Sequence, residues 1–127
     1  MKIKMYQALS IISIYERIRE TKVSAKIAYK FNKLRNTLIS DTDFYRTELN
    51  KIIEQYGERD ENGSLIPLDY GGGIKIKSEN VLTAQKEINE LDNLEIDAPN
   101  IKFTIDELDG LQLSIEDFNR ILPFIEE

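Results

Sequence analysis

Apolar side chains recur at helical spacing through the first 56 residues of the chain. Between residues 5 and 20 they are three or four positions apart, as at Met5 and Ile12, which places them on one face of a helix. Ser24 suits the N-cap of a second helix, since its hydroxyl can accept an amide proton of the following turn. The pattern predicts one helix over 5–20 and a longer one from residue 25 to about Tyr56.

The apolar positions of the longer helix form a seam with nearly coiled-coil spacing. At about 1.5 Å per residue this helix would extend about 45–50 Å, further than a domain of this size covers alone. We therefore expect a second long helix or a second copy of the chain along it, and hence a homo-oligomer. Cap-favouring residues at 40–43 interrupt the seam, and we favour one helix with a bend or a local polar contact over two helices. The seam residues are Ile27, Phe31, Leu34, Leu38, Tyr45, Leu49, Ile52 and Tyr56.

Shorter elements are predicted after Gly57, which ends the long helix. Ser78 caps a helix of about 79–93, and Ser114 opens a last helix that contains Phe118, Ile121, Leu122 and Ile125, with Pro123 inside it. Short apolar or alternating runs, separated by Gly, Pro and Asn-Gly turns, predict strands at 65–68, 74–77, 94–97 and 101–105.

The fold class that follows is α+β. The N-terminal helix and the long helix, with its coiled-coil-like seam, pack on a small β-sheet with two shorter C-terminal helices. Residues 1–127 are expected to form a single domain, with a helical part over 1–57 and a small α+β part over 58–127.

The composition excludes several classes of site. Without Cys the chain has no disulfide, zinc–thiolate site, iron–sulfur cluster or thiol nucleophile. Without His it lacks the commonest general base and transition-metal ligand. No metal site, cofactor site or activated nucleophile stands out, so we expect no metal, no cofactor and no enzymatic activity.

The chain shows no membrane segment, because no apolar stretch approaches the roughly 18–20 residues that a spanning helix needs. Its first 15 residues superficially resemble a signal peptide. However, Gln7, Ser10 and Ser13 interrupt the apolar run, and no cleavage site follows. We interpret this segment as an amphipathic element of a cytoplasmic protein.

Charge is unevenly distributed along the chain. Residues 1–40 carry a net charge of +7 and the remaining 87 residues carry −13, which leaves −6 for the whole. Three interpretations stay open: the two parts pack on each other within or between subunits, the basic part binds nucleic acid, or one charged part docks a protein of opposite sign. Nucleic acid is disfavoured, since 21 acidic residues would repel phosphate.

Two groups of charged residues are candidates for binding a partner protein. The basic group recurs along one helix face with Tyr29 beside it, and forms either a solvated stripe or an interface rim. The acidic group follows the predicted strand at 101–105, and forms either a solvated edge or a docking site for a basic partner. The candidate residues are Lys22, Lys26, Tyr29, Lys30, Lys33, Asp106, Glu107 and Asp109.

Four short segments resemble a group of small proteins encoded by tailed phages and prophages of Gram-positive bacteria. They are Lys26–Lys30 (KIAYK), Glu54–Gly63 (EQYGERDENG), Ile101–Leu108 (IKFTIDEL) and Leu122–Glu127 (LPFIEE). The group has no assigned activity, so no functional residue carries over. The resemblance implies a short accessory protein made in an infected bacterial cell.

The function we expect is that of a non-catalytic, oligomeric protein-binding module that docks on a bacterial host defence protein and inhibits it. An acidic surface would suit such an inhibitor, since it can occupy a basic site on its target. One alternative is a virion assembly factor or chaperone. Another is a sponge-like binder of a small nucleotide signal at a subunit interface, with its positive charge from Lys26, Lys30 and Arg35.

Overall fold

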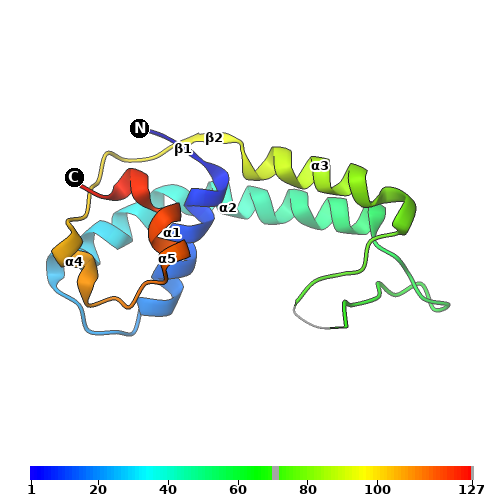
Figure 1. Ribbon diagram of the computed structural model, residues 1–127, viewed down its shortest axis with the longest axis horizontal. Coiled ribbons are helices and arrows are strands. Elements are labelled where there is room, and N and C mark those ends of the chain that lie inside the picture. Colours follow the sequence, from blue (N-terminus) through cyan, green and yellow to red (C-terminus); the bar gives the residue numbers. More distant parts are fainter. Residues whose placement is uncertain (70–71, 127) are drawn as a thin grey trace. The chain divides into compact units, whose positions relative to one another are not determined.

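The computed structural model describes residues 1–69 and 72–126, and its fold is α+β (Figure 1). The chain divides into two compact units. Unit 1 comprises Met1–Asp43 and Leu94–Glu127, and unit 2 comprises Phe44–Asn93, so the boundaries do not lie at residue 57. In chain order the elements are β1 (Lys2–Lys4), α1 (Met5–Ile18), α2 (Ala25–Tyr56), the 3-10 turn η1 (Ser78–Asn80), α3 (Val81–Asp92), β2 (Glu95–Asp97), α4 (Ile105–Asp109), α5 (Ile115–Arg120) and the 3-10 turn η2 (Leu122–Phe124).

The single sheet of the described residues lies in unit 1 and joins the two chain segments of that unit. Strand β2 confirms the strand predicted at 94–97, and it pairs antiparallel with β1, with Ile3 opposite Ile96. The apolar pattern does not indicate β1, because three residues are too few to show alternation. The side-chain oxygen of Gln7 accepts a hydrogen bond from the Lys4 amide at 2.9 Å, which satisfies a free donor at the start of α1.

The core of unit 1 gathers α1, the first half of α2 and the C-terminal segment. Phe31 of α2 and Phe103 are both buried, and their ring centroids lie 4.6 Å apart with 34° between the ring planes. The Phe103 amide donates to the Phe124 carbonyl at 2.7 Å, and the Phe103 carbonyl accepts from the Glu126 amide at 2.8 Å. These bonds fix the C-terminal segment beside Phe103, so that three aromatic rings share one core.

The strand predicted at 101–105 is wrong. Only Phe103 pairs in β fashion, through an isolated parallel bridge to Ile125, and Ile105 already begins α4. Thr104 is the N-cap of that helix: its hydroxyl accepts from the Glu107 amide, and the Glu107 carboxylate accepts from the Thr104 amide. This capping box satisfies two backbone donors locally, and it outweighs the alternating apolar pattern.

Two further predictions need correction. The strands expected at 65–68 and 74–77 are reduced to isolated bridges, because within the described residues these segments pair only at single residues: Arg59 with Leu65, Pro67 with Ile74 and Gly57 with Ile76. The last helix begins after Ser114 as predicted, but α5 ends at Arg120. The Ser114 hydroxyl accepts from the Asp117 amide at 3.0 Å, and Pro123 lies in the 3-10 turn that follows.

Helix α2 is continuous from Ala25 to Tyr56, as we favoured. The Ser24 hydroxyl accepts from the Ile27 amide at 3.3 Å, which confirms the predicted N-cap. Within the polar interruption at 40–43, Thr42 is fully buried, and its hydroxyl donates to the Ile39 carbonyl at 3.0 Å. A local polar contact therefore satisfies the buried hydroxyl within the continuous helix. Among the residues that the structure describes, no helix is long and apolar enough to span a bilayer.

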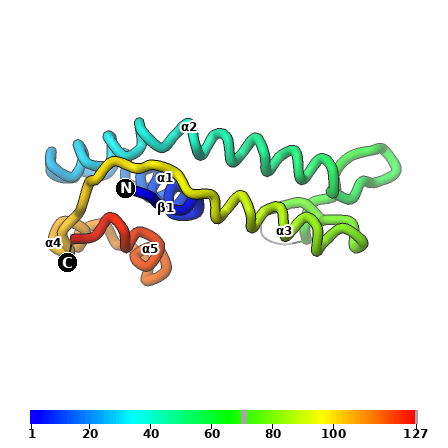
Figure 2. The backbone as a smooth tube through the Cα atoms, turned by 90° about the horizontal axis from the view of Figure 1, so that it is seen from above, coloured from blue at the N-terminus to red at the C-terminus, as the bar shows by residue number. Residues whose placement is uncertain are grey.

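Other segments of the same chain cover the seam of α2. In unit 1, Ile27, Phe31, Leu34 and Leu38 are buried in the core described above. In unit 2, Ile52 is buried, and the remaining seam residues Tyr45, Leu49 and Tyr56 are half-buried. Figure 2 shows α3 running beside the second half of α2 in this unit. The length of the seam therefore does not require a second copy of the chain, and the homo-oligomer stays a prediction.

Specific contacts mark the two ends of the α2 segment in unit 2. The Tyr45 hydroxyl donates to the Asp92 carboxylate at 2.8 Å and so ties α2 to the end of α3. At the other end, the Gly57 amide donates to the Ile53 carbonyl at 2.7 Å. A Cβ at residue 57 would lie 2.5 Å from both the Ile53 carbonyl oxygen and a Leu65 methyl carbon, so only glycine fits where α2 ends.

Burial, together with the bond to Asp92, raises the pKa of the Tyr45 hydroxyl to about 12. The unfolded chain releases this proton near pH 10, so the stability that the neutral hydroxyl contributes is complete below pH 10 and is lost as the pH rises toward 12. We expect the ultraviolet titration of tyrosinate to contain one component near pH 12 that is missing from Tyr45→Phe. A difference curve with its midpoint near pH 10 would contradict the buried hydrogen bond.

Candidate docking surface

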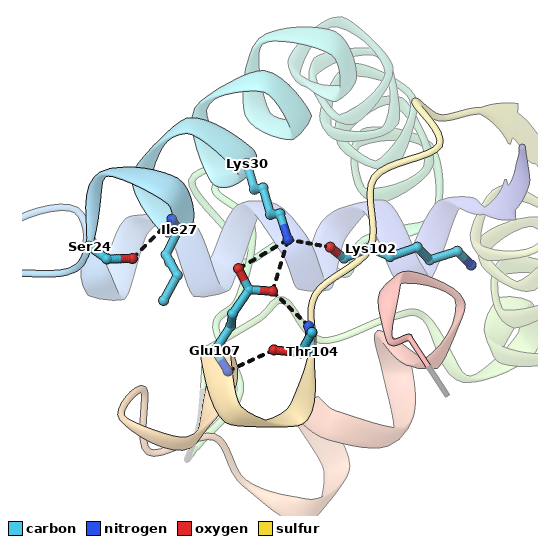
Figure 3. A network of polar contacts seen from close by, with 6 residues as sticks. All are labelled: Ser24, Ile27, Lys30, Lys102, Thr104 and Glu107. Atoms are coloured by element: carbon cyan, nitrogen blue, oxygen red, sulfur yellow. Dashed lines mark hydrogen bonds and ion pairs between the residues drawn. The ribbon is translucent and has the colours of Figure 1, made fainter.

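Two of the candidate residues, Lys30 and Glu107, bind each other (Figure 3). The Lys30 ammonium lies 2.8 Å and 3.1 Å from the two carboxylate oxygens of Glu107, and it donates to the Lys102 carbonyl at 2.6 Å. The side chains of Lys30 and Glu107 are only 17% and 13% exposed. Here the basic helix face packs against the acidic C-terminal part of the same chain.

Glu107 is held in its ionised form. The hydrogen bond from Lys30, and after it the bond from the Thr104 amide, lowers the pKa of the Glu107 carboxyl below its usual range. The same carboxylate closes the capping box at the start of α4. Lys30 and Glu107 therefore position α4 against α2 within unit 1, rather than projecting toward a partner. The other two acidic candidates, Asp106 and Asp109, are exposed on α4.

The remaining basic candidates define an exposed surface of unit 1, here called the basic face: Lys22, Lys26, Tyr29 and Lys33. Tyr29 is 63% exposed, and the Lys33 ammonium lies 5.7 Å from its ring centroid, within range of a cation–π contact. Among the described residues, none of these three lysines forms an ion pair. The basic face therefore carries charge that is not neutralised by a neighbouring carboxylate within 4.0 Å.

Two hollows border the basic face. The anchor hollow, of about 450 Å³, lies between the end of α1 and the start of α2, and the second, of about 400 Å³, lies along α2. Asn32 lines both, Lys22 lines the first, and Tyr29 and Lys33 line the second. The full lining of the anchor hollow is Tyr15, Ile18, Arg19, Thr21, Lys22, Val23, Ala28, Phe31 and Asn32.

The wall of the anchor hollow combines apolar side chains with positive charge. Its lining includes two cations, Arg19 and Lys22, and no carboxylate. Arg19 binds Glu16 at 3.1 Å on the exposed side of α1. Arg35 lies over the Tyr15 ring, with its guanidinium carbon 5.9 Å from the ring centroid. Such a wall can accept an apolar group that bears negative charge, but it brings together no nucleophile and base.

The hollow itself was not predicted from the sequence. Thr21, Lys22 and Val23 break the apolar periodicity between the two helices, and that break is the signal that could have located it. Arg19, Ala28 and Asn32 carry no sequence signal of their own, because their role depends on the angle between α1 and α2. Within the described ranges no group of acidic residues could hold a metal ion.

The fold and the basic face together define a small α+β protein with an exposed basic face, unpaired among the described residues, that borders a partly apolar hollow. Comparisons with models of protein families, with curated proteins and with solved structures gave no match to this chain.

Proposed function

We propose that this protein is a non-catalytic protein-binding module that docks an acidic partner through its basic face. The proposal rests on one observation: the candidate residues differ in whether they are paired within the chain or exposed to solvent. Lys30 and Glu107 bind each other within unit 1, whereas Tyr29 is 63% exposed between Lys26 and Lys33. Tyrosine is among the residues that dominate the binding energy of protein interfaces, and the lysines on either side of it would attract an acidic partner.

The charge distribution supports an acidic partner. The first 40 residues carry +7 while the whole chain carries −6, so the basic face stands out locally from an acidic molecule. Positive potential concentrated on one face accelerates encounter with a negatively charged surface and orients it. The acidic remainder of the chain would at the same time repel incorrectly oriented acidic partners.

The biological setting that we propose follows from the resemblance to phage-encoded proteins. In that setting the module acts in the cytoplasm of an infected bacterial cell as an oligomeric accessory protein, and it inhibits a host defence protein on which it docks. A virion assembly factor or chaperone would use the same face on a virion component. Light scattering on the full chain tests the homo-oligomer, and a single copy per particle at micromolar concentration would contradict it.

The nucleotide-binding alternative receives less support from the geometry. It needs Lys26, Lys30 and Arg35 to supply positive charge to one ligand. The Lys30 ammonium already binds the Glu107 carboxylate and the Lys102 carbonyl, and the Arg35 guanidinium lies over the Tyr15 ring. A panel of nucleotides in a thermal-shift assay is therefore expected to leave the melting temperature unchanged, whereas a ligand at 100 times its Kd would add about 2.7 kcal/mol.

Charge reversal tests the basic face. In the full chain, Lys22→Glu, Lys26→Glu and Lys33→Glu combined should reduce capture of the partner from infected-cell lysate at least tenfold, because positive charge attracts the partner. The matched control combines Lys51→Glu, Lys75→Glu and Lys86→Glu, three exposed lysines of unit 2 with the same change in net charge. Undiminished capture by the basic-face variant, with its circular dichroism unchanged, would refute the proposal.

A further inference from the structure

We infer that the anchor hollow receives an apolar side chain that stands among carboxylates in the partner's docking segment. This inference rests on the proposed function and names the chemistry of the partner: an acidic segment with one large apolar residue, such as leucine or phenylalanine. The occupant is a protein segment rather than a free small molecule.

The size of the hollow fits such an anchor. Its volume is about 450 Å³, many times the roughly 10–15 Å³ that one water molecule needs on the same measure. One large apolar side chain fills part of that space and leaves room for the backbone that carries it. Replacing poorly held water by apolar surface is the general driving force for anchoring a side chain in a hollow.

The chemistry of the wall fits as well. Val23, Ala28 and Phe31 supply an apolar floor, since Phe31 is buried and the other two are half-buried. Arg19, Thr21, Lys22 and Asn32 are exposed, so the hollow opens to solvent through a polar, positively charged rim. An apolar group flanked by carboxylates would therefore meet an apolar floor, the Lys22 ammonium, which is unpaired among the described residues, and Arg19, which also binds Glu16.

Continuity with the basic face argues for a protein segment. Lys22 belongs both to the rim of the anchor hollow and to the basic face, and Asn32 lines the hollow and its neighbour along α2. A chain anchored in the hollow would pass directly onto Tyr29 and Lys33. By contrast, a hollow on the second half of α2 is lined by Thr47, Asn50, Lys51, Glu54 and Gln55, which include no aliphatic or aromatic residue and set one carboxylate against one cation.

Three capped octapeptides test the inference on the full chain. The first has three acidic residues on each side of a central Phe-Ser pair, the second replaces that pair with Ser-Ser, and the third replaces the acids with Gln and Asn. Fluorescence anisotropy should give the first peptide a Kd at least tenfold lower than that of either other peptide. Its amide chemical-shift changes should centre on Thr21, Val23 and Ala28.

The outcomes separate this inference from the function on which it rests. Equal binding of the Ser-Ser peptide would overturn the anchor while leaving an acidic partner in place. Equal binding of the uncharged peptide would overturn the role of the cationic rim. If none of the peptides binds, the inference and the proposed function both fail. Decanoate, which carries a carboxylate on an apolar chain, serves as a small-molecule probe. If decanoate binds as tightly as the first peptide, the hollow is a site for a small amphiphile and the inference is overturned.

A variant that fills the hollow provides the matched control. Ala28→Leu should weaken the first peptide at least tenfold and leave the Ser-Ser peptide unchanged, whereas Ala25→Leu, at the exposed first residue of α2, should change neither. If Ala28→Leu unfolds the chain, Lys22→Glu provides a second test, because Lys22 is exposed and lies outside the helices. It should weaken both acidic peptides, and unchanged affinity for them would contradict the inference.

Discussion

Replacing Phe103 with alanine is expected to lower the free energy of unfolding by about 3–5 kcal/mol, since the fully buried ring leaves a cavity that its surroundings fill only in part. Phe103 packs on Phe31 of α2, with 4.6 Å between the ring centroids, and its backbone bonds hold the C-terminal segment. Urea unfolding followed by circular dichroism measures the change. The loss should come from unit 1, which contains both rings.

Phe44→Ala is the control for this prediction. Phe44 is 50% exposed, so its truncation should change the free energy of unfolding by about 1 kcal/mol or less. A double-mutant cycle between Phe31→Ala and Phe103→Ala should also return a coupling of about 0.5–1.5 kcal/mol for the aromatic pair. Equal destabilisation by Phe44→Ala and Phe103→Ala would contradict the packing of unit 1.

Removing the carboxylate of Glu107 is expected to have the next largest effect. Glu107→Ala should cost about 2–3 kcal/mol, because it breaks the capping box of α4 and leaves the Lys30 ammonium, 17% exposed, with the Lys102 carbonyl and the Phe103 ring but no counter-charge from the described residues. Glu107→Gln keeps an oxygen for the Thr104 amide and for Lys30, so it should cost about half as much. Glu54→Ala, which removes an exposed ion pair with Arg59, should cost about 1 kcal/mol or less.

The dependence of stability on pH distinguishes lost charge from lost packing at Glu107. The pKa of this carboxyl is lowered in the folded chain, so its contribution is complete above the unfolded value of about 4.5 and disappears as the pH falls through the lower, folded value. The gap in unfolding free energy between the wild-type chain and Glu107→Gln should therefore narrow below pH 4.5. A gap that stays constant down to pH 2 would show that the ion pair contributes nothing.

Local signals in the sequence were sufficient for much of the helical structure. Ser24 caps α2 and Ser114 caps α5, because a cap depends only on residues within one turn. The cap predicted at Ser78 is wrong, since Ser78 lies within the 3-10 turn η1 and α3 begins at Val81 without a side-chain cap. The strand prediction at 101–105 failed because Thr104 and Glu107 form a capping box, a local motif that competes with alternation over the same residues. Where two local patterns overlap, the one that satisfies more backbone groups prevails.

Contacts between distant residues could not be predicted in the same way. Lys30 and Glu107 were both candidates, but they are 77 residues apart and no periodicity links them. Likewise, the spacing of the seam on α2 shows that one face is buried, but it does not show what covers it. In the structure, segments of the same chain cover it, and of the four basic candidates outside the seam all but Lys30 stay exposed.

Site-specific photo-crosslinking in infected bacteria tests the basic face most directly. A benzophenone amino acid placed at Tyr29 should crosslink the partner that the unmodified chain captures, and the Lys22, Lys26 and Lys33 charge reversals should abolish that crosslink. The same photoreactive group at Leu82, 82% exposed on α3 in unit 2, should not crosslink that partner. A crosslink from position 82 with none from position 29 would contradict docking through the basic face.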